Sequence, residues 1–256
     1  MSAGQSPRVG LFITCLVDLV RPQIGFAAVK LLERAGCIVS VPSSQTCCGQ
    51  PAWNAGADGH AADIARKVVD AFETFDHVVA PSGSCAGMLR RHYPEVLAND
   101  PAYASRARAL AAKSHELMSF LVRVRGMKDT GISCDVRVCY HDSCSSLREM
   151  GVKAEPRQLL ASVQGLALDE LKEPEVCCGF GGLFSVKYPE ISERMGDDKV
   201  ADALGSGADT LVGPDLGCLL HLAGRMERQG KSMRVRHAAE ILAGMGDEPA
   251  LGEPRK

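Results

Sequence analysis

The second half of this 256-residue chain repeats the first, and cysteines mark the repeat. Each half has a single cysteine, then a Cys-Cys-Gly doublet, then a fourth cysteine, and corresponding cysteines are 129 to 133 residues apart. The eight residues are Cys15, Cys47, Cys48, Cys85, Cys144, Cys177, Cys178 and Cys218. Because self-similarity of this kind indicates repeated structural units, we predict two similar domains.

Hydrophobic patterning indicates the architecture of each repeat. In the first half, short apolar runs that end in turn-forming residues predict strands at 9–14, 37–41 and 77–80. Helical spacing of apolar residues predicts helices over 22–36 and 60–75. Strands that alternate with helices favour a parallel sheet with right-handed crossovers. The predicted fold class is therefore α/β, with two similar small parallel-sheet domains that carry helices on both faces and are related as an internal repeat.

The repeat and a break at Asn99-Asp100-Pro101 set the expected domain limits. The residues after this break, over 102–124, have the pattern of a helix. We therefore place the first domain at 8–98, a helical linker at 99–134 and the second domain at 135–243.

Composition excludes several classes of function. The 29 basic and 31 acidic residues give a net charge of −2, so no overall basic field attracts nucleic acid or an anionic membrane. Aromatic residues make up 5% of the chain, which leaves few stacking platforms for single-stranded nucleic acid. The sequence contains no apolar run of about 18 residues, the length that spans a bilayer.

The cysteine content argues against a disulfide-stapled protein. Eleven cysteines cannot all pair within one chain, and a chain of this length buries a sufficient core without staples. The apolar segment 9–17 resembles a secretory signal but lacks a small-residue cleavage site. We expect a protein of the reducing cytoplasm, where clustered cysteines more often bind metal or perform redox chemistry.

The repeated cysteines each fall just after a predicted strand. Because the carboxyl ends of parallel strands meet at one edge, loops from that edge form the ligand crevice of open α/β folds. Four thiols that are far apart in the sequence should therefore converge in each half. Nearby helix N-termini add positive potential, which favours the thiolate form that metals require.

The spacing of the cysteines favours an iron–sulfur cluster. Structural zinc sites usually take ligands from pairs spaced as C-x2-C, whereas the close pair here is an adjacent doublet. Gly49 and Gly179 follow the doublets and permit a sharp turn, and four thiolates are the usual complement of a cluster. Zinc and purely structural cysteines remain as alternatives.

The pattern C-x31-C-C-G-x35-C, repeated with similar spacing, resembles the cysteine-rich CCG domain. This domain is found in heterodisulfide reductase and in the iron–sulfur protein of glycolate oxidase. The sequence is most similar to the lactate utilisation protein A (LutA/YkgE) family, which has two such domains, and the likeness covers residues 8–243. The matching motifs are Cys47-Cys48-Gly49-Gln50-Pro51, Pro81-Ser82-Gly83-Ser84-Cys85, Cys177-Cys178-Gly179-Phe180-Gly181-Gly182 and Gly217-Cys218.

The resemblance implies an iron–sulfur electron-transfer subunit of a cytoplasmic complex that oxidises L-lactate to pyruvate. It implies clusters of the 4Fe–4S type, one or two per chain, and two partner subunits, one of them a ferredoxin-like iron–sulfur protein. A heterodisulfide-reductase-like subunit, or one that acts on another 2-hydroxy acid such as glycolate, is one alternative. A zinc-bound or cluster-free scaffold that only binds partners is another.

The sequence departs from the wider CCG pattern at one position in each half. The full pattern ends in C-x-x-C, and its last cysteine is replaced here by Met88 and His221. Four thiols per half favour a cluster of ordinary type and argue against disulfide chemistry. His221 is either an additional ligand or hydrogen-bond donor, or a surface histidine of a helix.

Several further residues have simpler interpretations. Cys37 and Cys139 lie in predicted strands and should act as small hydrophobic side chains, while Cys134 lies near a domain boundary. His141 precedes Cys144 by three residues and is expected to form a hydrogen bond near the cluster that tunes its potential.

Overall fold

The computed structural model describes residues 6–253 of the chain. The chain forms two compact units that divide between Met127 and Lys128. In the described part of the chain, no helix combines the length and the apolar character needed to cross a membrane.

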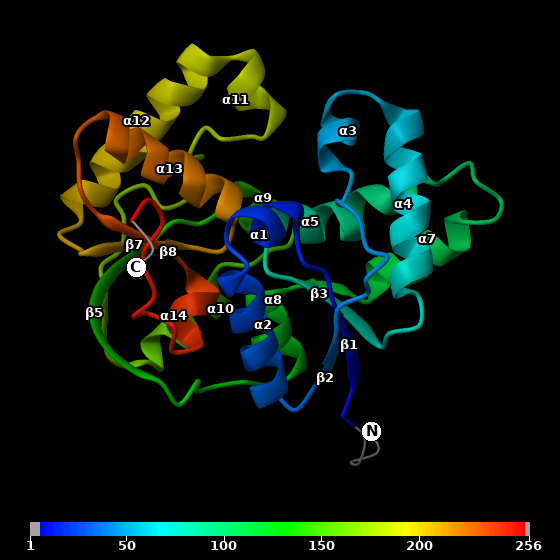
Figure 1. The fold of residues 1–256 in the computed structure, drawn as a ribbon, viewed down its shortest axis with the longest axis horizontal. Coiled ribbons are helices and arrows are strands. Elements are labelled where there is room, and N and C mark those ends of the chain that lie inside the picture. Colours follow the sequence, from blue (N-terminus) through cyan, green and yellow to red (C-terminus); the bar gives the residue numbers. More distant parts are fainter. Residues whose placement is uncertain (1–5, 254–256) are drawn as a thin grey trace. The chain divides into compact units, whose positions relative to one another are not determined.

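The first unit contains a four-stranded parallel sheet with the strand order β2–β1–β3–β4 (Figure 1). Its strands are β1 (Arg8–Leu11), β2 (Ile38–Ser40), β3 (His77–Ala80) and β4 (Ser114–Glu116). The three strands that the sequence predicts are confirmed, although β1 and β2 are shorter than their apolar runs.

Helices connect these strands and cover both faces of the sheet. They are α1 (Cys15–Val20), α2 (Gln23–Arg34), α3 (Gln50–Asn54), α4 (Asp58–Phe72), α5 (Gly83–Gly87), η1 (Met88–His92), α6 (Tyr93–Val96), α7 (Ala104–Ala112), α8 (Leu117–Ser119) and η2 (Phe120–Val124). The connections β1–α2–β2 and β2–α4–β3 run across the sheet in opposite directions, so right-handed crossovers place α2 and α4 on opposite faces. Both helices bury apolar residues at helical spacing, such as Ile24, Ala28 and Leu31 in α2.

The helix expected over 102–124 is not continuous, because strand β4 interrupts it. Ser114–Glu116 pairs in parallel with β3 and extends the sheet, so residues 99–127 contribute to the first unit. The Glu116 carboxylate accepts hydrogen bonds from the backbone N–H groups of Met118 and Ser119 and so caps the helix that follows. Residues Ser114–Glu116 have little strand propensity of their own, and they form a strand because they pair with the edge of β3. The domain limits at 98 and 134 stay a prediction.

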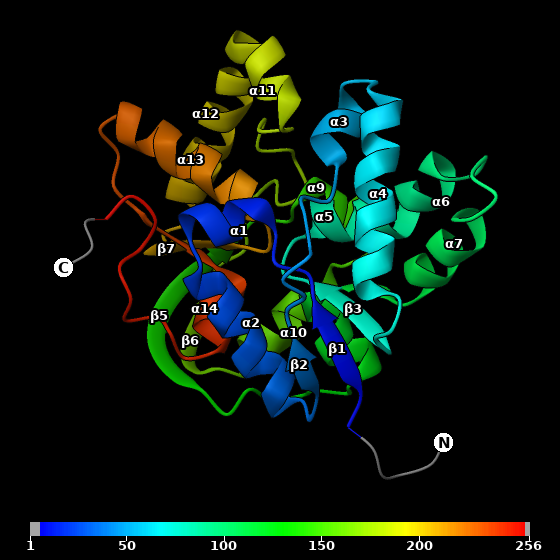
Figure 2. The same ribbon diagram turned by 45° about the vertical axis from the view of Figure 1, so that its right-hand side comes forward.

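The second unit repeats the topology of the first. Its parallel sheet has the order β6–β5–β7–β8, with strands β5 (Ser133–Tyr140), β6 (Gln164–Leu168), β7 (Thr210–Gly213) and β8 (Arg234–His237). Its helices are α9 (Cys144–Arg148), α10 (Ala154–Ala161), α11 (Leu183–Lys187), α12 (Pro189–Gly205), α13 (Leu216–Arg228) and α14 (Ala238–Leu242). Helices α12 and α13 pack side by side (Figures 1 and 2). The predicted α/β fold and the internal repeat are both confirmed.

Candidate metal centre

The single cysteines of each repeat lie at the switch point of each sheet. Cys15 begins α1 directly beyond β1, and Cys85 lies in α5 directly beyond the neighbouring strand β3. Cys144 begins α9 beyond β5, and Cys218 lies in the first turn of α13 beyond β7. In sheets of this order the connections leave these two strands toward opposite faces, which opens a crevice at their carboxyl ends.

Each doublet reaches this crevice through a glycine turn. Gly49 and Gly179 have φ angles of +82° and +87°, in the left-handed region that other residues rarely adopt. The turn directs each glycine's backbone N–H at a sulfur, at 3.5 Å from Gly49 to Cys47 Sγ and 3.3 Å from Gly179 to Cys177 Sγ. The glycine after each doublet is therefore required by the backbone.

The first unit brings its four repeated cysteines together. The Sγ atoms of Cys15 and Cys47 are 3.9 Å apart, and the thiol of Cys48 interacts with those of Cys47 and Cys85. Cys48 and Cys85 are buried, whereas Cys15 and Cys47 are partly exposed. Two of the four thiols are therefore buried in the core, and two lie at the accessible side of the crevice.

The second unit reproduces this arrangement. Cys144 interacts with Cys177, and Cys178 interacts with both Cys177 and Cys218. Cys178 and Cys218 are again the buried members, with exposed fractions of 1% and 7%. All eight cysteines singled out by the repeat thus lie in two four-thiol groups, one in each unit.

Each group stabilises one thiolate by itself. Hydrogen bonds from the thiols of Cys15 and Cys48 and from the Gly49 amide lower the pKa of Cys47 to about 2. The corresponding contacts lower the pKa of Cys177 to about 2. Interaction with Cys47 and then burial raise the pKa of Cys48 well above its ordinary value. Because further thiolates repel the first one, ionising all four requires a cation among them.

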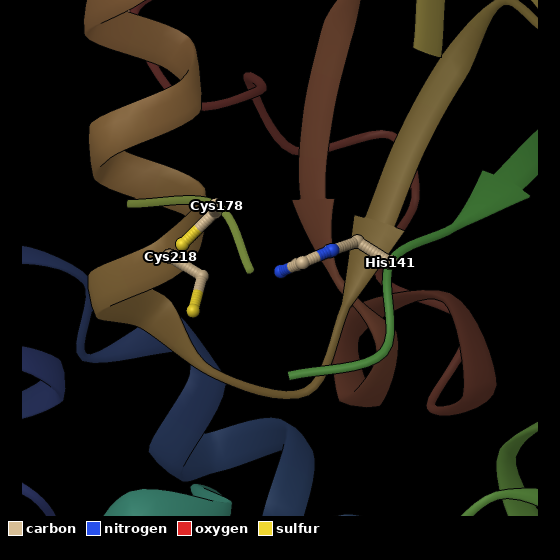
Figure 3. A group of neighbouring side chains, drawn as sticks. All are labelled: His141, Cys178 and Cys218. Atoms are coloured by element: carbon tan, nitrogen blue, oxygen red, sulfur yellow. The ribbon is translucent and has the colours of Figure 1, made fainter. Parts of the chain in front are cut away.

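A buried histidine adjoins the second group. His141 follows the carboxyl end of β5, and its ring points at the sulfurs of Cys178 and Cys218 (Figure 3). One ring nitrogen and the two Sγ atoms lie within 4.8 Å of one another. Burial lowers the pKa of His141 to about 4, so the ring is neutral. The ring lies where the sequence predicts it but makes no hydrogen bond to the protein in the described part of the chain.

The other candidates have different contacts. His221 Nε2 is 3.3 Å from the carbonyl oxygen of Ser192 and its ring also interacts electrostatically with Cys177, and Met88 is buried in η1. Cys37 and Cys139 are buried beside or within strands, which agrees with their interpretation as small hydrophobic side chains. Cys134 is partly exposed in β5.

Two charged side chains of the second unit, one partly buried and one fully buried, carried no signal in the sequence. Arg157 in α10 donates two hydrogen bonds to the Asp142 carboxylate, at 3.0 and 2.9 Å, and also pairs with Glu170. Lys199 in α12 is 2% exposed, and its ammonium group donates to the carbonyl of Glu173. These partners come from separate elements, so only the tertiary fold brings them together.

A cavity opens beside the rim cysteines of the first group. It has a volume of about 360 Å³ and lies between the start of α1, including Cys15 and Leu19, and the loop from Val41 to Cys47. Cys15 and Cys47 are partly exposed and line this cavity, so molecules in solution can reach these two residues.

The donor set fits a cluster better than a single ion. A tetrahedral metal with metal–sulfur bonds of about 2.3 Å needs four sulfurs that are all about 3.8 Å apart. Among the described residues, the one group of three donor atoms mutually within 4.8 Å is His141 with Cys178 and Cys218. In the described part of the chain no three of the thiols are mutually this close, which matches a wider inorganic core whose irons take separate thiolates.

Comparison with known proteins identifies the family. Residues 9–90 and 138–223 each match the model of the cysteine-rich CCG domain. The chain is 48% identical over 235 residues to lactate utilization protein A of Geobacillus kaustophilus. The aligned region covers 92% of this chain and 98% of that protein. The chain belongs to the lactate utilization protein A family. The Bacillus subtilis member of this family is 45% identical over the same length and with the same coverage.

A solved structure shows the same fold. The structure of a hypothetical protein from Helicobacter pylori superimposes on this chain with a TM-score of 0.61. The match covers 96% of this chain and 50% of that protein. The two sequences are 11% identical, so the likeness concerns the fold alone. The resemblance that the repeated motifs indicated is therefore confirmed by sequence relatives that match along nearly their whole length.

Proposed function

We propose that this family member is an iron–sulfur electron-transfer subunit of a complex that oxidises L-lactate to pyruvate. The observation that carries the proposal is the pair of four-thiol groups, each built at the switch point of a parallel sheet. We assign Cys15, Cys47, Cys48 and Cys85 as ligands of one cluster and Cys144, Cys177, Cys178 and Cys218 as ligands of a second.

The chain's own residues favour a bound cluster in three ways. The amides of Gly49 and Gly179 donate to ligand sulfurs and stabilise negative charge there. The buried cysteines keep water from one side of the group, which affects its potential. The partly exposed rim cysteines give a redox partner a short path to the sulfurs. A bound cluster supplies one-electron transfer, and the 4Fe–4S type takes four thiolates.

The substrate and the partners come from the family rather than from the site. The named relatives are lactate utilization proteins, which supports L-lactate as the compound oxidised by the complex. We propose two further subunits, one of them a ferredoxin-like iron–sulfur protein, and a cytoplasmic location. Metal binding, in contrast, is supported by the thiol groups themselves.

Cysteine variants of the full chain test the ligand assignment. We expect Cys178→Ala and Cys48→Ala each to remove about half of the iron and acid-labile sulfide of anaerobically purified protein. The double variant should retain neither. Cys139→Ala and Cys37→Ala are the matched controls, since each removes a buried thiol of the same unit outside the group, and both should keep full iron.

Two results would overturn the proposal. Zinc in place of iron after anaerobic purification would favour a structural scaffold. Equal loss of iron from the ligand variants and the controls would show that the assigned thiols do not hold the metal. With iron in place, L-lactate should bleach the visible absorbance of the assembled complex but not that of this chain alone.

A further inference from the structure

The two thiol groups differ at one buried position. Phe12 and His141 occupy the same place in their units, since each lies three residues before the first cysteine. Each donates its backbone N–H to the neighbouring strand, Phe12 to the carbonyl of Val79 at 2.8 Å and His141 to that of Val212 at 2.9 Å. Both side chains are fully buried. The repeat thus holds a phenyl ring in one unit and an imidazole in the other.

The two rings have different surroundings. The ring of Phe12 packs against Phe72 in the apolar core of the first unit. Neither ring nitrogen of His141 has a hydrogen-bond partner in the part of the chain that the structure describes. Burying a polar atom without a partner is energetically costly. The described part of the protein does not supply a partner for this imidazole, so a bound group is needed to supply one.

The position of the ring indicates what that partner is. A ring nitrogen of His141 lies within 4.8 Å of the Sγ atoms of Cys178 and Cys218 (Figure 3). With metal–sulfur bonds of about 2.3 Å and metal–nitrogen bonds of about 2.0 Å, donors on one tetrahedral metal are about 3.5 Å apart. A modest shift of the ring therefore brings it within reach of an iron that one of these sulfurs binds.

The surroundings of the ring suit ligation. Neither ring nitrogen is engaged by a hydrogen bond in the described part of the chain, so a lone pair is available to a metal. A neutral imidazole has a lone pair on one ring nitrogen, which is the form that binds metals. Lys199 itself is buried and interacts electrostatically with Cys178, so it offsets some of the negative charge of the thiolates.

We propose that His141 is a fifth donor of the second group and binds iron through a ring nitrogen, so that the two clusters are not equivalent. The inference rests on the proposed iron–sulfur function. The first unit then holds its cluster by sulfur alone, and the second by sulfur and nitrogen. Because the ligand set tunes the reduction potential of a cluster, the additional imidazole donor should give the second cluster a potential that differs from that of the first.

Pulsed electron paramagnetic resonance of the reduced full chain tests this assignment. Protein grown with ¹⁵N-histidine should show a strong nitrogen coupling that differs from that of unlabelled protein. His141→Phe, which installs the ring of the first unit, should abolish the coupling and shift the potential of one cluster while leaving the other unchanged. His221→Phe replaces a histidine of the same unit that bonds to a carbonyl, and it should leave the coupling intact.

The outcomes separate this inference from the proposed function. Full iron and sulfide without a strong histidine coupling in the wild-type chain would overturn His141 ligation but leave the electron-transfer role standing. A weak coupling, of the size that a hydrogen-bonded ring gives, would have the same meaning. The wild-type measurement decides the point even if His141→Phe does not fold. Protein that binds no iron would overturn the proposed function first.

Discussion

Replacing the glycine after the second doublet should destabilise the protein far more than the same change in the first. Gly179→Ala and Gly49→Ala put a methyl group on backbones with nearly the same φ, +87° and +82°. Left-handed backbone costs a residue with a Cβ atom about 1–2 kcal/mol, and both variants share this strain. The difference between them depends on what the new methyl group meets.

The neighbours of the two glycines differ. A Cβ atom on Gly179 would lie 2.5 Å from the carbonyl oxygen of Ser192 and 2.8 Å from Met195 Cβ, both of which belong to α12. On Gly49, the nearest atom is Cγ2 of Ile64 at 3.2 Å, which a small rotation of that side chain relieves. Relieving the clash at Gly179 requires a shift of α12, and overpacking of this kind costs about 1–3 kcal/mol more.

The shift also breaks a hydrogen bond. Ser192 Oγ donates to the carbonyl oxygen of Gly179 at 2.8 Å inside the core, which contributes about 1 kcal/mol. We expect Gly179→Ala to lower the free energy of unfolding by about 3–6 kcal/mol and Gly49→Ala by about 1–2 kcal/mol. The larger loss should be accompanied by loss of iron from the second unit, because Gly179 also donates its N–H to Cys177 Sγ.

Anaerobic urea denaturation followed by far-UV circular dichroism measures these losses. Trp53, the single tryptophan, lies in α3 and reports on the first unit, so its fluorescence should respond to Gly49→Ala more than to Gly179→Ala. Gly205→Ala in α12 is the control, since its methyl group would meet no atom within 4 Å. If Gly179→Ala costs no more than Gly49→Ala, the clash with Ser192 does not exist and the argument is wrong.

Two further predictions concern buried charge. Asp142 is 2% exposed and forms a two-bond ion pair with Arg157, so Asp142→Asn should lower the free energy of unfolding in urea by about 2 kcal/mol. Glu170 also pairs with Arg157 but is exposed, so Glu170→Gln should lower it by less than about 1 kcal/mol. Equal losses in the two variants would contradict this. Burial lowers the pKa of His115 to about 4 from 6.5, so the unfolded state binds more protons in that window and stability falls as the pH drops through it. The loss of Tm between about pH 7 and pH 5 should therefore be smaller in His115→Gln than in the wild type, and an unchanged loss would refute the assignment.

The repeat and the alternation of strand and helix were sufficient to predict the fold class. Residues such as Ile24, Ala28 and Leu31 have the spacing of a helix that is buried on one side, and this local pattern survives in α2. Strand β4 could not be predicted in this way. Its residues Ser114–Glu116 become a strand because the edge of β3 is free to pair with them, which is a property of the sheet.

For the candidate site as well, some features could be predicted from the sequence and others required the tertiary structure. Sequence placed Cys15, Cys85 and their counterparts after strands, and parallel topology alone then brings them to one edge. It predicted His141 near the thiols but left His221 open as an additional ligand. His221 bonds to the carbonyl of Ser192, whereas His141 points at two sulfurs, and both facts depend on how separate elements pack.

The amino-acid sequence by itself determined that two four-thiol groups exist and where along the chain their members lie. It could do so because strand order and strand direction constrain which loops meet. The tertiary structure alone decided which sulfurs are buried, which glycine has no room for a methyl group and how the ring of the buried histidine faces the thiols. These properties depend on distances between side chains of different elements, and no local pattern in the sequence records them.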